Sequence, residues 1–387
     1  MIILSIGSDR NLFIKDSDAQ NRIREYGKLF NQLHIIVFSG IENNYQNIII
    51  DDNIFVYPTN HTLKLFYLHK IYKIAKSIYK NNKFSAITAQ DPFESGLAGW
   101  LLKLIYKAPL QIQIHTDVFS PYFWRESLNN KIRVFLAEFL LLKADGIRVV
   151  SERIRLSLEL NVKCSRFHRG FSTKSEQMPN VSVLPIFVDV NKIRNAKIEI
   201  DLHKKYPQYD FIILMASRLT REKNIGMAIK AFSEMAGRKS EIKNPLLLIV
   251  GEGPELDNLK VQSRKLKIDG NVIFQPWTDN LVSCYKTADL FLLTSNYEGY
   301  GRTVVEAMAA GLPVIMTNVG LAGDILKDNL NGLVIPVNDL GELKRGIRIL
   351  MDSREKRNSI SRKSIETTAD FMAKKDYLEK YRNLMLI

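Results

Sequence analysis

Two glutamates eight residues apart, Glu298 and Glu306, lie in the segment with the clearest chemical pattern, NYEGYGRTVVEAMAAG. The apolar run Leu290–Leu293 before them predicts a buried strand, and the residues after them predict a helix. Gly299 and Gly301 allow the backbone to approach a ligand and present amides at the helix N-terminus, which favour an anion. Carboxylates accept hydrogen bonds from hydroxyl groups, so the segment predicts a site for a sugar carried on a diphosphate. The alternative is a carboxylate that complements the helix dipole beside a flexible loop.

A second candidate is the segment SRLTREKN, residues 217–224, which joins the apolar run FIILMAS to the helical pattern NIGMAIKAFSEM. Arg218 and Lys223 lie before the predicted helix N-terminus, where both can bind phosphate and stabilise the charge that builds on a leaving diphosphate. The alternative is a solvated basic loop, because Arg221 lies there as well.

The elements that must position these residues alternate between strand and helix along the whole chain, which predicts parallel sheets covered by helices. The predicted strands are IILSIG, HIIVFS, IFVYP, FSAITA, PLQIQIH, GIRVVS and SVLPIFV, then FIILMAS, PLLLIVG, NVIFQP, DLFLLTS, PVIMTN and GLVIPV. We expect an α/β chain of two doubly wound domains, residues 1–190 and 191–365, followed by a helical segment 366–387 that crosses back to the first domain. Ligands of such sheets bind at the carboxyl ends of the strands.

Residues about 211–340 resemble the donor domain of family 4 glycosyltransferases (glycosyl transferases group 1). The motifs that carry the resemblance are SRLTREKN, GEGPELDNL, ADLFLLTSNYEGYG, EAMAAGLPVI, NLNGLVIPV and the spacing of Glu298 and Glu306. Members of this family are retaining enzymes with the GT-B fold, in which two Rossmann-like domains face a cleft. The resemblance therefore implies that the first domain binds the acceptor and the second binds a nucleotide-sugar donor.

The resemblance also implies roles for single residues. Arg218 and Lys223 would hold the diphosphate, Glu306 would accept hydrogen bonds from the ribose, and Glu298 would contact the donor sugar. Two further sets complete the implied donor site: the backbone amides of Gly299, Tyr300 and Gly301, and the segment with Phe274 and Gln275, against which the nucleobase would lie.

The first domain resembles the family less. His115, at the end of LQIQIH, is similar to the family's histidine beside the donor sugar, although a histidine that merely ends a strand is the alternative. Asp91, in TAQDP, matches a cleft loop and is a candidate for contacting the acceptor. The first loop has Gly7-Ser8-Asp9-Arg10 where the family has two adjacent glycines, and Asp9 is a second candidate for the acceptor.

Composition sets broader limits. A chain of 387 residues with 46% hydrophobic and 25% charged residues is expected to form two globular domains. Two distant cysteines, Cys164 and Cys284, and the lack of a signal sequence or membrane-spanning run favour the cytoplasm, or the inner face of the cytoplasmic membrane.

The net charge of +14 predicts an anionic partner. Part of it lies on a predicted helix at residues 63–83, which carries Lys70, Lys73, Lys76, Lys80 and Lys83. These lysines form either a solvated face or a contact with anionic lipid head groups. Nucleic acid is not an expected partner, because no recognised binding module accompanies the charge.

No metal and no cofactor are predicted. Asp16-Ser17-Asp18 has the spacing of a metal-binding pair, but Ser17 and Gln20 fit a helix cap better. GEGPEL has Leu256 where a dinucleotide fingerprint has its third glycine.

The sequence thus predicts a metal-independent, retaining hexosyltransferase. It would move a sugar from a UDP- or GDP-sugar to a hydroxyl of a glycan or lipid-linked glycan, in the synthesis of polysaccharide, lipopolysaccharide or lipid-linked oligosaccharide. Two alternatives remain open: a sugar-nucleotide epimerase or hydrolase of the same fold, and an inactive subunit that binds sugar nucleotides.

Overall fold

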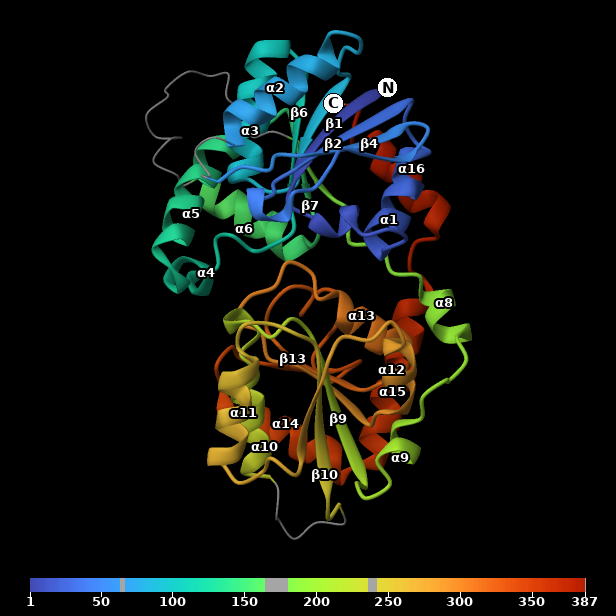
Figure 1. The fold of residues 1–387 in the computed structure, drawn as a ribbon. Helices are drawn as coiled ribbons and strands as arrows, with labels where there is room; N and C mark the ends of the chain where they lie inside the picture. Colours follow the sequence, from blue (N-terminus) through green and yellow to red (C-terminus); the bar gives the residue numbers. More distant parts are fainter. Residues whose placement is uncertain (63–66, 164–179, 236–241, 387) are drawn as a thin grey trace. The chain divides into compact units, whose positions relative to one another are not determined.

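The chain forms two compact units, which we describe separately (Figure 1). A computed structural model describes residues 1–62, 67–163, 180–235 and 242–386. The first unit contains Met1–Pro185 and Lys374–Ile387, and the second contains Ile186–Ala373. Cys164 and the first residues of the predicted lysine-rich helix lie outside the described residues.

The first unit is built on an eight-stranded sheet with the order β3-β4-β2-β1-β5-β6-β7-β8. Its strands are β1 Ile2–Gly7, β2 Gln32–Val37, β3 Ile48–Asp51, β4 Ile54–Pro58, β5 Ala86–Ala89, β6 Leu110–Ile114, β7 Gly146–Val149 and β8 Asn180–Val183. All neighbours are parallel except β3, which pairs antiparallel with β4. The runs of β1, β2 and β4 to β7 were predicted from the sequence, whereas β3 was not.

The predicted strand SVLPIFV is wrong in its position, because β8 ends at Val183. Pro185 follows shortly after and has no N–H to continue a ladder. The carbonyls of Leu184 and Pro185 instead accept hydrogen bonds from the guanidinium of Arg148, at 3.2 Å each.

Helices cover both faces of this sheet. They are α1 Asp18–Gly27, α2 Tyr67–Tyr79, α3 Glu94–Tyr106, α4 Pro121–Glu126, α5 Leu128–Leu141, α6 Glu152–Lys163 and α16 Lys374–Asn383. Helices α2, α3, α5 and α6 form one layer, in which each contacts the next, and α1 and α16 lie on the opposite face (Figure 1). This division follows from right-handed crossovers, which place helices on opposite faces when the strand order reverses.

A buried arginine, Arg148 on β7, joins α16 to the sheet. Its side chain donates to Gln113 Oε1 on β6 at 2.8 Å and to the hydroxyl of Tyr377 on α16 at 2.9 Å. It also binds the carbonyls of Leu184 and Pro185, where the chain leaves the unit. One buried cation therefore contacts both the departing and the returning segment of the chain.

The returning helix makes further contacts with unit 1. The ring of Tyr381 stacks on that of Tyr26 of α1 at 4.4 Å between centroids, and its hydroxyl accepts from Gln113 at 3.3 Å. Lys374 pairs with Glu25 at 3.1 Å. Helix α16 therefore belongs to the packing of the first unit.

The second unit has a six-stranded, fully parallel sheet with the order β11-β10-β9-β12-β13-β14. Its strands are β9 Phe211–Ala216, β10 Pro245–Val250, β11 Val272–Gln275, β12 Leu290–Leu293, β13 Val314–Thr317 and β14 Leu333–Ile335. All six had been predicted, because buried parallel strands are continuous apolar runs. This order is that of a dinucleotide-binding sheet, with its switch point between β9 and β12.

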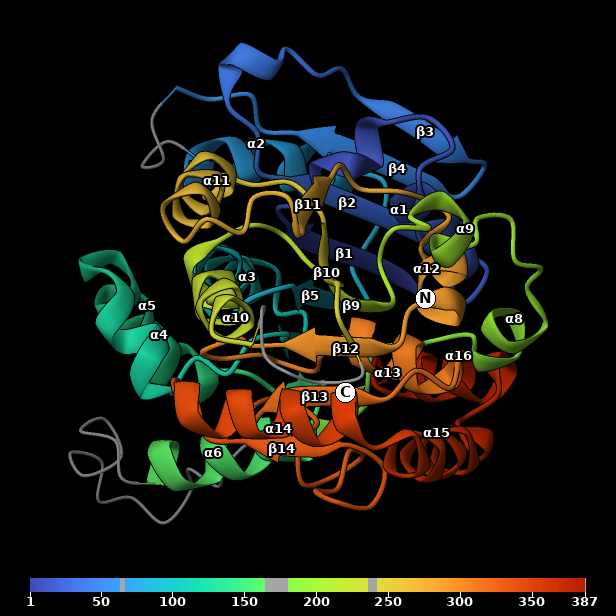
Figure 2. The same cartoon turned by 90° about the horizontal axis from the view of Figure 1, so that it is seen from below.

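The helices of the second unit are α8 Val190–Asn195, α9 Leu202–Lys205, α10 Ile225–Ser233, α11 Leu256–Lys265, α12 Leu281–Thr287, α13 Arg302–Ala309, α14 Leu340–Asp352 and α15 Arg354–Ala369. Figure 2 shows α10 and α11 side by side, in agreement with their contacts. Helix α15 stays with this unit, since Ser364 Oγ donates to the Asn331 carbonyl at 2.7 Å. The division before Lys374 thus differs from the expected one at residues 365/366, which falls inside α15.

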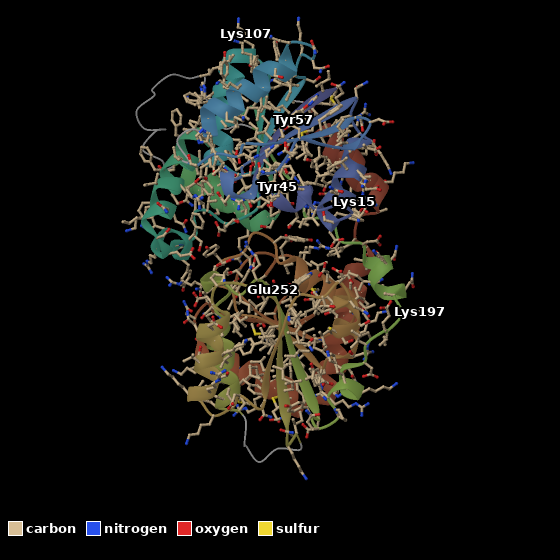
Figure 3. The ribbon with its side chains drawn as sticks, viewed as in Figure 1. Lys15, Tyr45, Tyr57, Lys107, Lys197 and Glu252 are labelled. Atoms are coloured by element: carbon tan, nitrogen blue, oxygen red, sulfur yellow. The ribbon has the colours of Figure 1, made fainter. Side chains whose placement is uncertain are left out.

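Lys107 and Lys197 are exposed and point away from the cores of their units (Figure 3). Within the described part of the chain, no helix combines the length and apolar character that crossing a bilayer requires.

Candidate active site

Two loops meet at the switch point of the second sheet, one after β9 and one after β12. Thr294 Oγ1 donates to the carbonyls of Lys223 and Asn224, at 2.9 and 3.1 Å. The Asn296 amide donates to the Glu222 carbonyl at 2.7 Å. These bonds hold together two segments that are about seventy residues apart in the sequence, and they place both at the carboxyl ends of neighbouring strands.

Lys223 and Glu298 form an ion pair at this junction. The distance from Lys223 Nζ to Glu298 Oε1 is 2.5 Å, and the side chains are only 14% and 13% exposed. Ser295 Oγ donates to the same carboxylate oxygen at 2.8 Å. The cation assigned to the diphosphate and the carboxylate assigned to the donor sugar are therefore one electrostatic unit, which the sequence alone did not indicate.

Glu306 lies on α13 and is also nearly buried, with 13% of its side chain exposed. Arg302 Nε donates to Glu306 Oε1 at 2.7 Å, and the Tyr285 hydroxyl donates to Oε2 at 3.1 Å. The pKa of Tyr285 lies well above its ordinary value, mainly because the phenol is buried and also because the negative charge of Glu306 lies beside it. The phenol therefore stays protonated and fixes one oxygen of Glu306 as an acceptor.

Arg218 lies apart from this pair. Its side chain is 78% exposed and approaches Glu222 at 3.5 Å. The neighbouring Arg221, equally exposed, approaches Glu255 at 3.3 Å. The structure brings Lys223, Glu298 and Ser295 together, whereas Arg218 pairs with Glu222 instead.

The turn into α13 depends on two glycines. Gly301 has φ +97° and begins the helix without a side-chain cap, so the first amides of α13 keep their capacity to bind an anion. Gly320 has φ +54°, and a β-carbon there would lie 2.5 Å from the Tyr300 carbonyl oxygen. The Leu321 amide donates to that carbonyl at 3.0 Å, which fixes the Gly299–Gly301 turn from behind.

The motif GEGPEL supports the loop after β9. A β-carbon at Gly251 would lie 1.9 Å from the Ser217 carbonyl oxygen, and one at Gly253 would lie 2.4 Å from that of Leu219. The Leu219 amide donates to the Glu252 carbonyl at 2.8 Å. These glycines therefore permit a close approach of two backbone segments.

Phe274 and Gln275 end β11, two strands from β9. Phe274 is partly buried and packs against the core of the unit. Gln275 Nε2 donates to the hydroxyl of Tyr206. Both lie at the carboxyl edge of the sheet, where they contact the core of the unit and Tyr206 instead of the Lys223–Glu298 pair.

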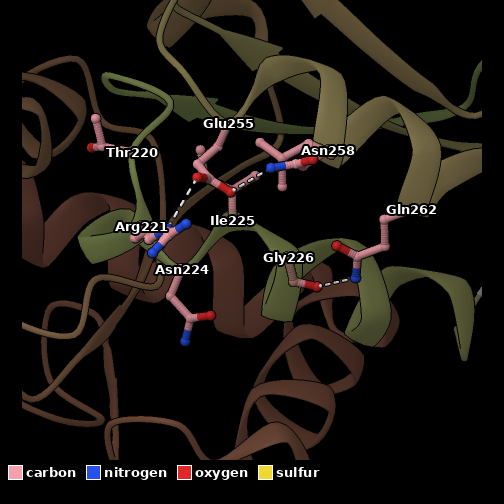
Figure 4. Close-up of a pocket in the computed structure, with 9 residues that line it drawn as sticks. Thr220, Arg221, Asn224, Ile225, Gly226, Glu255, Asn258 and Gln262 are labelled. Atoms are coloured by element: carbon pink, nitrogen blue, oxygen red, sulfur yellow. Dashed lines mark hydrogen bonds and ion pairs between the residues drawn. The ribbon is translucent and has the colours of Figure 1, made fainter. Parts of the chain in front are cut away.

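A polar pocket of about 220 Å³ lies beside this junction (Figure 4). It is lined by Thr220, Arg221, Asn224, Ile225, Gly226, Glu255, Asn258, Leu259 and Gln262. Its polar groups bind one another: Asn258 donates to Glu255 Oε2 at 3.2 Å, and Gln262 donates to the Gly226 carbonyl at 2.8 Å. None of the donor-site residues named from the sequence lines it.

In the first unit, His115 follows β6 on the face that carries Gln113. Burial lowers the pKa of His115 to about 3, and the positive charges of Arg148 and Arg22 lower it further. The imidazole is therefore neutral near pH 7, where it can donate one hydrogen bond and accept another.

Asp91 and Asp9 follow β5 and β1, which are neighbours at the reversal of strand order. Asp91 accepts from the amides of Phe93 and Ser95, at 2.9 and 3.2 Å, and from the Ser95 hydroxyl. Burial raises the pKa of Asp91. Asp9 accepts from the Asn11 amide at 3.2 Å and pairs with Arg22 at 3.1 Å. Both carboxylates thus bind their own loop and the helix that follows it.

The Asp-Ser-Asp segment is a helix start, as predicted. Ser17 Oγ accepts from the Gln20 amide at 3.2 Å, and Gln20 Oε1 accepts from the Asp16 amide at 3.1 Å. Asp16 is exposed and pairs with Arg24. Among the residues that the structure describes, no group of three or more potential ligands is arranged around a metal position.

Comparison with known proteins finds the family that the sequence motifs resemble. The family "Glycosyl transferases group 1" matches residues 198–367. The chain is similar to the alpha-monoglucosyldiacylglycerol synthase of Streptococcus pneumoniae, with 27% identity over 315 residues, which cover 78% of this chain and 67% of that protein.

Two solved structures show the same fold. The sucrose-phosphate synthase of Thermosynechococcus elongatus superposes with a TM-score of 0.81 at 17% identity, over 99% of this chain and 98% of that one. The Anabaena protein HepE, solved in complex with UDP-glucose, superposes with a TM-score of 0.73 at 17% identity, over 99% of both chains.

Proposed function

We propose that the chain transfers a hexosyl group from a nucleotide-diphosphate sugar to a hydroxyl of an acceptor glycan, because residues 198–367 match the glycosyl transferases group 1 family and the two sheets have the GT-B fold. The observation that carries the proposal is the nearly buried Lys223–Glu298 pair at the switch point of the second sheet, with Glu306 on the helix that follows Glu298. The donor is a UDP- or GDP-sugar, and the complex of HepE with UDP-glucose favours UDP.

Lys223 binds the diphosphate in this proposal. The diphosphate competes with Glu298 for the ammonium group, so donor binding frees the carboxylate to accept from a sugar hydroxyl. A fixed cation at the leaving group stabilises the charge that develops there. Arg218, which is exposed, adds a second cation when the diphosphate is bound. With these cations present we expect the transfer to proceed without a metal ion.

Glu306 binds the ribose. Tyr285 and Arg302 hold its carboxylate in place. The carboxylate is therefore already oriented to accept hydrogen bonds from the ribose before the nucleotide binds. The amides of Gly299, Tyr300 and Gly301 bind the donor beside it. We assign the nucleobase to the edge of the sheet at Phe274 and Gln275.

The reaction retains the configuration of the sugar. The bond from the anomeric carbon to the diphosphate oxygen breaks, and the bond to the acceptor oxygen forms on the same face. The acceptor proton passes to the departing phosphate oxygen, so no protein nucleophile takes part. His115 contributes a neutral hydrogen-bonding group, and Asp91 and Asp9 belong to loops proposed to contact the acceptor.

The acceptor is a glycan, free or linked to a lipid, of the kind used in polysaccharide, lipopolysaccharide or lipid-linked oligosaccharide synthesis. The similarity to a glycolipid synthase supports the lipid-linked form.

A nucleotide-sugar screen tests the proposal. One or more UDP- or GDP-sugars should raise the melting temperature, and the hits should then be assayed with and without glycan acceptors. Release of nucleoside diphosphate with formation of an α-linked product supports transfer. Release without acceptor, or an altered donor sugar, assigns the chain to hydrolysis or epimerisation, and binding without any product assigns it to an inactive subunit. EDTA should leave the transfer rate unchanged.

A further inference from the structure

Exposed apolar side chains concentrate on a small part of unit 1. Of the 19 large hydrophobic residues that are exposed in the described chain, eight lie on α3 to α6. Leu104 and Ile105 lie near the end of α3, with 59% and 52% of their surface exposed. Soluble proteins rarely expose such residues in groups, and a group rimmed by polar residues marks an interaction surface.

Three of these residues, on α4 and α5, form an apolar ridge, which we define as Trp124, Leu128 and Ile132. Leu128 and Ile132 are one turn apart on α5 and are 76% and 60% exposed. Trp124, on α4, is 39% exposed, and the ammonium of Lys131 lies 5.9 Å from the centre of its ring. A cation therefore stands directly beside the apolar ridge.

The rest of this helix layer is strongly basic. Helix α2 and the turn after it carry the lysine face, which we define as Lys70, Lys73, Lys76, Lys80 and Lys83, and all five are exposed. Lys107, Arg125 and Lys131 are exposed as well. Among the described residues of α2 to α5, Glu126 is the one exposed carboxylate. Such a surface attracts an anionic partner.

The basic and apolar groups lie on one side of the unit. Helix α2 contacts α3, and α3 contacts α5, on the same face of the sheet (Figure 1). Their exposed side chains therefore point outward from one layer. We propose that this layer is the surface by which the protein attaches to an anionic phospholipid bilayer, with the apolar ridge inserted at the head groups and the lysine face against the phosphates.

A bilayer fits this surface better than a second copy of the chain. A two-fold dimer would place each lysine face opposite the same positive charges or close to them, and like charges across an interface oppose binding. Tryptophan beside lysine, next to exposed leucine and isoleucine, is typical of segments that lie at the membrane boundary. The attachment is independent of which sugar the second unit transfers.

Vesicle sedimentation with the full-length protein tests the proposal. Wild-type protein should sediment with vesicles that contain phosphatidylglycerol and remain in solution with pure phosphatidylcholine. Changing all five residues of the lysine face to Gln should lower the partition coefficient by about two orders of magnitude or more, because each lysine near the surface contributes about fivefold. Trp124→Ser/Leu128→Ser/Ile132→Ser should leave a weak binding that salt abolishes.

Matched controls lie in the second unit. Val261→Ser/Leu330→Ser removes apolar residues that are 45% and 48% exposed, and Arg264→Gln/Lys265→Gln/Lys267→Gln removes three exposed cations. Both variants should sediment as the wild type does. The tryptophan emission of the wild type should shift to the blue on acidic vesicles, and Trp124→Phe should lack the shift.

Three results would overturn the proposal. The first is a wild type that binds acidic vesicles no better than neutral ones. The second is the finding that the ridge variant and the lysine variant both bind acidic vesicles as strongly as the wild type does. The third is a wild-type dimer in sedimentation velocity that the ridge variant loses, which would assign the surface to self-association. Failure of nucleotide-sugar binding would affect only the proposed function.

Discussion

Replacing Lys223 by Met should destabilise the protein and abolish most of its activity. The change leaves the Glu298 carboxylate, 13% exposed, without its cation. Two unit charges about 4 Å apart interact by about 4 kcal/mol at an effective dielectric constant of about 20. Breaking a buried pair by removing one partner costs about 3–5 kcal/mol. We therefore expect the free energy of unfolding, measured in urea, to fall by that amount.

A double variant separates the structural from the chemical role. Lys223→Met/Glu298→Gln removes both charges, so most of the stability should return. Its turnover should stay two to three orders of magnitude below that of the wild type, which is the usual loss when a charged transition-state contact is removed. Arg221→Met is the matched control in the same loop, because an exposed pair such as Arg221–Glu255 contributes at most about 1 kcal/mol.

Two outcomes would refute this reasoning. If the double variant were no more stable than Lys223→Met, the two charges would not be coupled in solution. If Lys223→Met turned over at the wild-type rate, Lys223 would not bind the leaving diphosphate.

Three further predictions concern the donor site and His115. Glu306→Gln should weaken binding of the bare nucleoside diphosphate in calorimetry, because an amide is a poorer acceptor for ribose hydroxyls; unchanged affinity would remove the ribose role. Gly320→Ala should lower turnover at least tenfold, since the new methyl group meets the Tyr300 carbonyl, while Gly270→Ala, with no atom within 4 Å, should not; equal rates would contradict the account of the turn. The pKa of His115 is about 3 in the folded chain and about 6.5 in the unfolded chain. As the pH is lowered below ~6.5, only the unfolded chain binds the proton, so the free energy of unfolding falls by up to about 1.4 kcal/mol per pH unit. His115→Gln should flatten this decline in urea titrations at pH 5 to 7, and an unchanged slope would show that the imidazole titrates normally.

Much of the fold follows from local sequence. Runs such as FIILMA are buried at every position, and six apolar residues between polar turns have the length of a buried strand and are too short for a typical buried helix. The position predicted for β8 was wrong because SVLPIFV is as apolar as the runs that do form strands. Its end was decided by Pro185 and by Arg148, a residue far away in the sequence.

The candidate site was predictable only in part. The sequence placed Lys223 and Glu298 after strands, but their contact depends on β9 lying beside β12, which long-range pairing decides. Tyr285 gave no signal, because LVSCY reads as an ordinary core helix, yet its hydroxyl orients Glu306. One signal was present and not used: the alternation in LQIQIH places Gln111 and Gln113 on one face of a buried strand, and a buried polar face requires partners.

That polar face has a consequence for the order in which the protein is made. When residues 1–185 have left the ribosome, every strand of the first sheet exists, but the hydroxyl of Tyr377 that binds Arg148 has not been translated. Arg148 then lacks the one of its hydrogen-bond partners that α16 supplies, so this face of the sheet remains incompletely covered until the last helix emerges. The second unit, contiguous from Ile186 to Ala373, has all of its residues once Ala373 has emerged, before α16 is available to the first unit. The second unit therefore has its complete set of residues before the first, and a message that stops before codon 374 yields a first unit that lacks part of its own interior.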